Sequence, residues 1–312
     1  MIQSNDMVSV IIPTYNRAYE TIRALKSVIA QTYNNFEVLV IDDCSDDYEL
    51  LKKMIAQIDD KRIKLIRNDI NRNGAFARNV GINLAIGKYI AFLDSDDEWD
   101  SQKLHYQVET ANKHTGNNFL IYCKSHVIRR GYVEELPHES IREDQSVANY
   151  LFVCGGFMPT PSLFLPVSLA RKNLFNENLL RHQDYDFLLK LEGKAIFILI
   201  NRVLVKIYAN HPERSEKRGA NYNISKKFLV EYDRYFNIQE KNYFWLQNVG
   251  FYMARSNNKI DAIISVLKNK HYKYVKLKHL LTYIIYYLFV NTIAYGLLER
   301  VFLFFRYRLK NK

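Results

Sequence analysis

The first hundred residues alternate short apolar runs with segments of helical periodicity. The continuous, largely β-branched run at 8–13 predicts a strand that is buried on both faces, and 36–41 predicts a second buried strand. The segments 62–66 and 89–93 predict a third and a fourth strand. The segments 18–31, 50–58 and 75–86 between them carry apolar residues at helical spacing. Because strands and helices alternate at this pitch, we expect right-handed βαβ units and an α/β fold with a mostly parallel sheet flanked by helices.

Beyond residue 118 the regular alternation of strands and helices ends. Strands are predicted at 119–123 and 132–134, as a hairpin around Gly131, and again at 195–199 and 203–208, with a helix at 184–191. Beyond Ser225 the pattern is helical throughout. The chain has 312 residues with 48% hydrophobic content, which suffices for one large core and a smaller appendage. We therefore expect an α/β domain over 1–215 and a helical C-terminal region over 216–312.

Charge and cysteine content narrow the location and the partners. The net charge is +11, with much of the excess late in the chain, which suits an anionic membrane surface, a phosphorylated substrate or nucleic acid. Paired zinc ligands and an aromatic RNA-binding signature are both missing, so we expect no nucleic-acid partner. Cys44, Cys123 and Cys154 have no metal or redox spacing, and 1–7 lacks the apolar core of a signal peptide. These features favour a reduced, cytoplasmic chain.

Acidic residues follow two of the predicted strands. Asp42 and Asp43 come after the second strand, and Asp94, Asp96 and Asp97 come after the fourth. Open α/β sheets bind ligands at the carboxyl ends of their strands. Each aspartate alone has an ordinary alternative as a turn or helix-cap residue. Two acidic clusters on one edge instead favour a cation or hydrogen-bond donors between them.

Four motifs stand in order along the same hundred residues. They are VSVIIPTYNR at 8–17, VIDD at 40–43, GAFARNVG at 74–81 and FLDSDD at 92–97. Together they resemble the family 2 glycosyltransferases of the GT-A fold, with weaker matches to about Ser215. The resemblance implies inverting transfer of a sugar from a nucleotide sugar, usually a UDP or dTDP sugar, with Mg²⁺ or Mn²⁺. It also suggests a role in bacterial cell-surface polysaccharide biosynthesis.

The resemblance implies a metal site in the acidic motif. Asp96 would hold the metal, and Asp94 would face the ribose or the metal. A hard cation bound by carboxylates neutralises the charge that develops on the leaving diphosphate. Asp97 supports the site or caps the helix that runs through Trp99 and Leu104. His211, in YANHP, resembles a histidine that completes the metal shell in some relatives; a hydrogen-bonded loop histidine is the alternative.

The resemblance also implies a nucleotide-sugar site, and its residues would be Pro13, Thr14, Tyr15, Arg17, Asp42, Arg78, Asp94 and Ser95. The Asp42 carboxylate can accept the imide N–H of uracil or thymine. Tyr15 either packs on the base or covers the core. The two arginines contact phosphate or base, or are ion-paired surface groups.

An inverting reaction needs a general base for the acceptor hydroxyl. The resembled family places it in an acidic pair, usually Glu-Asp, at the start of a helix. Here Gln183 stands at the first position and Asp184 keeps the position of the base. Asp186 is the second candidate or a helix cap.

Three rival functions lack their signatures. Processive synthases of the family carry Gln-x-x-Arg-Trp, but the tryptophans here are Trp99 and Trp245, so one sugar per encounter is expected. A sugar nucleotidyltransferase would need a glycine-rich basic loop after the first strand, and PTYNR has no glycine. A non-catalytic nucleotide-sugar-binding protein would show a broken D-x-D motif or lack the base. In this sequence the D-x-D motif is intact and Asp184 stands at the position of the base.

The C-terminal region contains an uncharged stretch at 280–298, which follows several lysines and precedes a second apolar run at 301–305. This pattern predicts a membrane-surface hairpin or short anchor whose lysines face anionic lipid at the inner face of the cell membrane. A spanning helix and a helix buried on the α/β domain are the alternatives. A surface-bound transferase would suit a glycan or lipid-linked saccharide acceptor.

Overall fold

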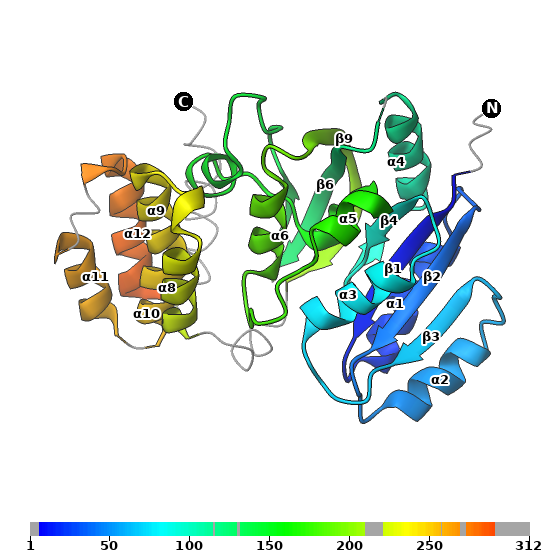
Figure 1. Cartoon of the computed structure of the whole chain (residues 1–312). Helices are drawn as coiled ribbons and strands as arrows, with labels where there is room; N and C mark the ends of the chain where they lie inside the picture. The colour runs from blue at the N-terminus through cyan, green and yellow to red at the C-terminus, as the bar shows by residue number, and fades with distance from the viewer. Residues whose placement is uncertain are drawn as a thin grey trace. The chain divides into compact units, whose positions relative to one another are not determined.

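The computed structural model describes residues 6–114, 116–129, 132–209, 221–256, 258–268 and 273–290. These residues group into two compact units, which are labelled by element in Figure 1. Unit 1 takes in the described residues within Met1–Glu143, Phe157–Leu179 and Gln183–His211. Unit 2 takes in those within Asp144–Gly156, Leu180–His182 and Pro212–Lys312.

Unit 1 is built on a nine-stranded sheet in the order β3-β2-β1-β4-β8-β6-β9-β5, with β7 paired to β6. The strands are β1 (Val8–Thr14), β2 (Phe36–Asp42), β3 (Ile63–Arg67), β4 (Tyr89–Phe92), β5 (Glu98–Trp99), β6 (Phe119–Arg129), β7 (Tyr132–Leu136), β8 (Phe164–Pro166) and β9 (Ile196–Tyr208). The first four strands are parallel, as is the β6–β9 pair, while β5, β7 and β8 run antiparallel to their neighbours. The predicted mostly parallel α/β sheet is confirmed.

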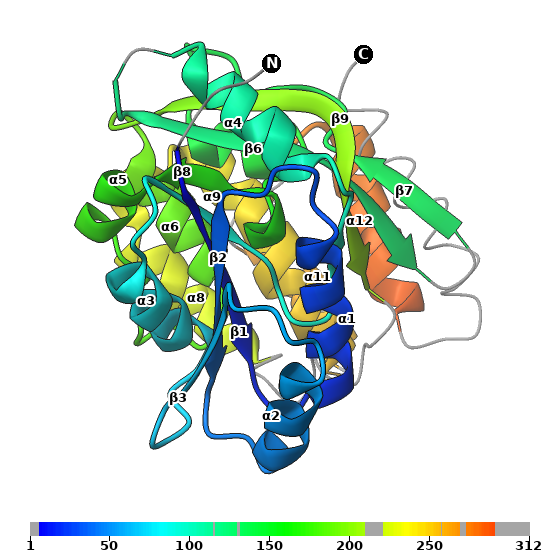
Figure 2. The same ribbon diagram turned by 90° about the vertical axis from the view of Figure 1, so that its right-hand side faces the viewer.

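Helices cover both faces of this sheet. They are α1 (Ala18–Ile29), α2 (Tyr48–Ala56), α3 (Gly74–Leu84), α4 (Lys103–Asn112), α5 (Val167–Lys172) and α6 (Gln183–Leu191), with a 3₁₀ turn at Thr160–Ser162. Figure 2 shows α1 and α3 on opposite sides of β1 and β2. β1, β2 and β4 are thereby buried at every residue, whereas β3 and β9 keep part of their surface exposed.

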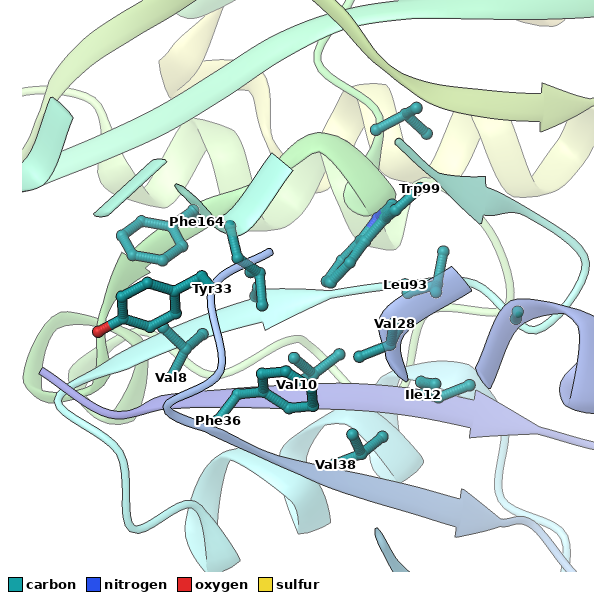
Figure 3. Close-up of a cluster of buried hydrophobic side chains, with 14 of the residues drawn as sticks. Val8, Val10, Ile12, Val28, Tyr33, Phe36, Val38, Leu93, Trp99 and Phe164 are labelled. Carbon is teal, nitrogen blue, oxygen red and sulfur yellow. The ribbon is translucent and has the colours of Figure 1, made fainter. Parts of the chain in front are cut away.

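The alternation of side chains along β1 explains the two-sided core. Val8, Val10 and Ile12 are fully buried in the layer that also holds residues of α1, α2 and α4 (Figure 3). Ile11 points to the other face, where α3 packs so closely that a Cβ on Gly81 would lie 2.5 Å from Ile11 Cγ2. Glycine is therefore required at position 81 for α3 to approach the sheet.

Unit 2 is helical over its described residues. Its elements are a π-helical turn at Asn149–Val153, α8 (Tyr222–Glu231), a 3₁₀ turn at Asp233–Tyr235, α9 (Ile238–Phe244), a π-helical segment at Trp245–Gly250, α10 (Phe251–Arg255), α11 (Lys259–Lys268) and α12 (Leu277–Phe289). Aromatic rings form its core: Phe228 stacks on Tyr232 at 4.2 Å, and Phe152 meets Phe244 edge-on at 5.0 Å between ring centroids. None of the helices described is both long and apolar enough to cross a bilayer.

Short elements account for the differences from the predicted pattern. The two strands expected at 195–199 and 203–208 are one strand, β9, whose register shifts opposite Cys123–Ser125 of β6. The two-residue β5 and three-residue β8 were not predicted, because runs this short carry no periodicity.

Candidate functional site at the carboxyl edge of the sheet

The carboxyl ends of β2, β1 and β4 lie side by side in the sheet. Thr14 at the end of β1 is in register with Asp42 at the end of β2. On the other side of β1, Ile11 is in register with Phe92, and Asp94 follows two residues later. The strand order therefore brings the two acidic motifs to the same edge, on either side of the end of β1.

Asp42 is fully buried and only partly satisfied. Its Oδ2 accepts a hydrogen bond from the Ser45 backbone N–H at 3.1 Å and lies 3.7 Å from Arg67 Nε. Its Oδ1 is buried and has no hydrogen-bond partner among the described residues. A buried carboxylate oxygen without a donor is costly, so Asp42 offers an acceptor for an incoming N–H group.

The loops around Asp42 are locked to each other. Asn16 adopts a positive φ of 51° and donates its backbone N–H to Ser45 Oγ at 2.9 Å. The Asn16 side chain exchanges hydrogen bonds with Asp46 at 2.7 and 3.1 Å. Asp47 accepts the Ala18 backbone N–H at 2.8 Å, which holds the start of α1. The segment that follows β1 is thus fixed against the segment that follows β2.

Besides Asp42, three more residues expected to recognise the nucleobase lie at this junction of β1 and β2. Pro13 is buried in β1, in register with Ile41. Thr14 is buried too, and its hydroxyl lies 2.7 Å from that of Thr21 in α1. Tyr15 is half-buried directly after the strand. All three are therefore near Asp42 through the register of β1 with β2.

Asp94 and Asp96 are each paired with an arginine. Arg17 Nη1 lies 2.6 Å from Asp96 Oδ2, and also 3.5 Å from the buried Ser95 hydroxyl. Arg78 Nη2 lies 2.5 Å from Asp94 Oδ1. The two carboxylates keep 31% and 23% of their side-chain surface exposed, whereas the arginines keep only 12% and 15%. The carboxylates of Asp94 and Asp96 are thus more exposed to solvent than the arginines that pair with them.

Asp97 does not cap a helix, and Trp99 is not helical as expected, although Leu104 is. Residues Glu98–Trp99 form strand β5, and α4 begins only at Lys103. The buried Asp97 carboxylate instead accepts the Tyr208 backbone N–H at 3.0 Å, at the end of β9. Burial raises the pKa of Asp97 well above its usual value, and the nearby charges of Asp94 and Asp96 add to this effect.

A second set of contacts holds residues 94–97, here called the acidic turn, to β9. Arg23 Nε lies 2.9 Å from Glu98 Oε1, and its guanidinium also donates to the Asp96 carbonyl at 2.5 Å. The Tyr208 hydroxyl donates to Glu98 at 2.9 Å, and its ring lies 4.3 Å below the Arg23 guanidinium. Sequence reasoning missed Arg23, Glu98 and Tyr208, because nothing local to the D-x-D motif shows that β9 ends beside it.

Arg78 joins the acidic turn to the start of α6. Its Nη1 donates to Gln183 Oε1 at 3.3 Å while its Nη2 holds Asp94. The Gln183 amide in turn donates to Asn73 Oδ1 at 3.2 Å and to the Leu179 carbonyl at 2.7 Å. Asn73 caps α3 by accepting the backbone N–H groups of Ala75 and Phe76. Elements more than a hundred residues apart in sequence therefore converge on one guanidinium.

Asp184 lies next to this junction, in the first turn of α6. It is half-buried, and burial raises its pKa above the usual value, although the Tyr185 backbone N–H and the Arg78 charge act in the opposite direction. Asp186 is fully buried; it accepts the Asn176 backbone N–H at 2.9 Å and pairs with Lys190 at 2.8 Å. Its carboxylate is therefore engaged in structure, which favours Asp184 for proton transfer.

The donor atoms of the acidic turn fit a hard divalent cation. Within the described residues, no cluster of three or more His, Cys, Asp or Glu side chains is arranged to hold a metal. Mg²⁺, however, is usually bound by one or two carboxylates, substrate phosphates and water. In the described part of the chain, Asp94 Oδ2 and Asp96 Oδ1 make no hydrogen bond, so each acid retains one oxygen. His211 lies outside the described residues.

The fold and the site define an α/β protein with a charged, partly exposed ligand site at the carboxyl ends of its parallel strands. Residues 9–159 match the sequence profile described as glycosyl transferase family 2. The chain is also 33% identical over 228 residues to the amylovoran biosynthesis glycosyltransferase AmsB of Erwinia amylovora, covering 71% of this chain and 76% of that one. The chain belongs to glycosyl transferase family 2, and it is a glycosyltransferase.

Another relative and two solved structures extend the comparison. The Escherichia coli UDP-Glc:alpha-D-GlcNAc-diphosphoundecaprenol beta-1,3-glucosyltransferase WfgD is 43% identical over 102 residues, covering 33% of this chain and 40% of that one. S. aureus TarS 1-349 in complex with UDP-GlcNAc has a TM-score of 0.63 at 19% identity, over 95% and 91% of the two chains. The mannosyltransferase PcManGT from Pyrobaculum calidifontis, in complex with GDP-Man and Mn²⁺, has a TM-score of 0.60 at 16% identity, over 85% and 76%. These structures share the GT-A fold with this chain.

Proposed function

We propose that this glycosyltransferase moves one sugar, with inversion, from a UDP or dTDP sugar to a glycan or lipid-linked saccharide acceptor in cell-surface polysaccharide biosynthesis. The observation that carries the proposal is the pair of contacts made by Arg78, which joins Asp94 of the acidic turn to Gln183 at the start of α6. The residues proposed for the leaving group and for the acceptor thereby adjoin each other.

The nucleobase is proposed to bind at the junction of β1 and β2. The unpartnered Asp42 Oδ1 accepts the imide N–H of uracil or thymine, which a cytosine ring does not present. Pro13 and Thr14 border this position on the neighbouring strand, and Tyr15 directly follows that strand. The UDP-GlcNAc in the TarS complex and the UDP-Glc in the name of WfgD support a uridine donor.

We assign the diphosphate to a position at the acidic turn, with Arg17, Ser95 and Arg78 around it. Asp96 and Asp94 would hold Mg²⁺ or Mn²⁺ through their remaining oxygens, and His211 is a further candidate ligand. When bound, the cation supplies positive charge to the leaving diphosphate. Arg17 and Arg78 keep the acids in place before the donor arrives and supply two more positive charges nearby. The Mn²⁺ in the PcManGT complex supports the choice of metal.

Proton transfer falls to Asp184. In an inverting displacement the acceptor hydroxyl attacks the anomeric carbon from the face opposite the diphosphate, and a base removes its proton. Asp184 lies at the start of α6, where burial raises the pKa of its carboxyl toward that of a useful base. The Gln183 side chain orients the adjacent Arg78 without adding a negative charge beside the base.

The relatives and the sequence support the proposed acceptor and location. The names of AmsB and WfgD point to polysaccharide biosynthesis and to a diphosphoundecaprenol-linked acceptor in those proteins. We assign this chain a comparable acceptor, with catalysis in residues 1–215 and the helical region 216–312 bringing the enzyme to the inner face of the cell membrane as a peripheral protein.

A donor screen tests this function. The full chain is incubated with a panel of nucleotide sugars and Mg²⁺ or Mn²⁺, and release of nucleoside diphosphate is measured, with water taking the sugar in place of the acceptor. We expect release from a UDP or dTDP sugar, stopped by a chelator and by Asp96→Asn. The control is Asp59→Asn, the same chemical change at an exposed aspartate in the loop before β3, which should leave the rate unchanged. Full turnover by Asp96→Asn would refute the metal assignment.

A further inference from the structure

Helices α11 and α12 of unit 2 are apolar on the face that points away from the unit's core. In α11, Ile260 is 73% and Leu267 is 59% exposed, while Ala262 and Val266 on the opposite side are buried. At 100° per residue, Ile260, Ile264 and Leu267 form one stripe. A soluble helix normally places polar residues on such a face.

Helix α12 repeats this arrangement over a greater length. Leu277, Leu281, Ile285 and Leu288 recur at helical spacing, with exposed fractions from 48% to 69%. The opposite face is fixed in unit 2: the Tyr287 hydroxyl donates to the Leu246 carbonyl at 2.6 Å, and His279 Nδ1 lies 2.7 Å from the Tyr243 hydroxyl. Because these contacts hold the inner face, the helix cannot rotate to bury its outer leucines.

The two helices are antiparallel neighbours, and three lysines gather where α11 ends and α12 begins. Lys259 Nζ at the start of α11 donates to the Leu288 carbonyl at the end of α12, at 3.0 Å. Lys268 ends α11, and Lys273 and Lys276 precede α12; all three lysines are exposed. Asp261 is the only acidic residue on either helix. The pair thus combines apolar stripes with a basic end.

We propose that the outer faces of α11 and α12 insert into the interface of an anionic lipid bilayer, with Lys268, Lys273 and Lys276 at the level of the headgroups. An amphipathic helix that lies in the membrane plane needs an apolar face and nearby basic residues, and this pair provides both. The basic end favours an anionic bilayer over a second copy of this chain, which would bring the same cations together. The proposal deepens the proposed function, since a lipid-linked acceptor gives the contact its purpose.

Vesicle flotation of the full chain tests this surface. The protein is mixed, without substrates, with vesicles of phosphatidylcholine alone or of phosphatidylcholine with phosphatidylglycerol. We expect flotation with the anionic vesicles and loss of flotation as salt is raised. Leu281→Gln/Ile285→Gln should weaken partitioning by roughly tenfold or more, because two half-exposed apolar side chains no longer enter the interface. Lys268→Gln/Lys276→Gln should weaken it by roughly fivefold per lysine on anionic vesicles only.

The matched control removes the same kind of side chain elsewhere on unit 2. Val230→Gln/Ile238→Gln changes two exposed apolar residues, at 77% and 55%, on α8 and α9, and should float like the unaltered chain. Equal flotation of Leu281→Gln/Ile285→Gln and this control would overturn the proposal. So would failure of the unaltered chain to float, or a vesicle-independent dimer that Leu281→Gln/Ile285→Gln dissociates.

A separate readout distinguishes this surface from the catalytic proposal. Release of nucleoside diphosphate from the donor alone is measured without lipid, and the α12 variant should match the unaltered chain. Flotation without any release would refute the proposed function and leave the surface standing. Release without flotation would refute the surface and the membrane location assigned to residues 216–312, and leave the proposed transfer reaction standing.

Discussion

Arg78 provides a sharp test, because its guanidinium holds two partners at once. Arg78→Lys keeps the positive charge but replaces a planar fork with a single ammonium, which cannot reproduce both contacts. The contact with Asp94, at 2.5 Å, is the stronger, since it joins two charges. The contact with Gln183, at 3.3 Å, is neutral on one side and weaker.

The size of the effect follows from these contacts. A hydrogen bond that involves a charged group contributes about 1.5–3 kcal/mol. Asp94 is 31% exposed, so water compensates part of the loss, and we take about 1.5–2 kcal/mol. This corresponds to a fall in kcat/KM of roughly tenfold to thirtyfold. Since Arg78 positions both the acidic turn and α6, we expect the loss mainly in kcat.

The assay is the initial rate of nucleoside diphosphate release, with donor concentration varied at saturating metal. The matched control is Arg72→Lys, which makes the same substitution in an exposed ion pair with Glu177, at 3.3 Å and with side chains 48% and 35% exposed. An exposed pair contributes little, so its kcat/KM should change less than about threefold. If Arg78→Lys behaves like Arg72→Lys while both variants keep their melting temperature, the assigned role of Arg78 is refuted.

Three further predictions concern other buried groups. Asp42→Asn should weaken UDP binding by roughly tenfold in calorimetric titration, since the amide presents a neutral and weaker acceptor to the imide N–H; unchanged affinity would contradict base recognition there. Burial raises the pKa of Asp184, so kcat/KM should fall on acidification at a higher pH than an ordinary aspartate would give, and Asp184→Asn should lower kcat by roughly a hundredfold to ten-thousandfold; a normal rate would exclude it as the base. Burial lowers the pKa of Lys103 to about 7. The unfolded chain therefore binds more protons than the folded chain above that pH, and stability should rise by about 2–3 kcal/mol from pH 7 to pH 9 relative to Lys103→Met in denaturant titrations. Parallel pH profiles for the two proteins would contradict this account of Lys103.

The sequence predicted the first half of the sheet because its two central strands, β1 and β2, have seven residues each and are buried throughout. Runs such as 8–13 and 36–41 leave no other structure that satisfies both the apolar pattern and the β-branched content. β5 pairs with β9 through Glu98 and Trp99 alone, and this pairing is a tertiary contact that no local pattern encodes. For the same reason Trp99 was wrongly expected in the helix that contains Leu104.

The acidic residues of the candidate site could be predicted from the sequence, but the arginines that pair with them could not. The positions of Asp42, Asp94 and Asp96 at strand ends follow from alternation along the chain. That Arg17 pairs with Asp96 and Arg78 with Asp94 depends on how α1 and α3 pack against the sheet. Likewise, only the three-dimensional structure shows that Asp42 Oδ1 is buried without a hydrogen-bond partner among the described residues.

The central claim is that the acids ending β2 and β4 serve one nucleotide-and-cation site. A crystal structure with UDP and Mn²⁺, with the metal located by its anomalous signal, tests this claim most directly. We predict Mn²⁺ at about 2.0–2.3 Å from an oxygen of Asp96 or Asp94, in contact with the diphosphate, and the uracil imide N–H on Asp42 Oδ1. Uracil bound away from Asp42, or Mn²⁺ with no ligand from the acidic turn, would contradict it.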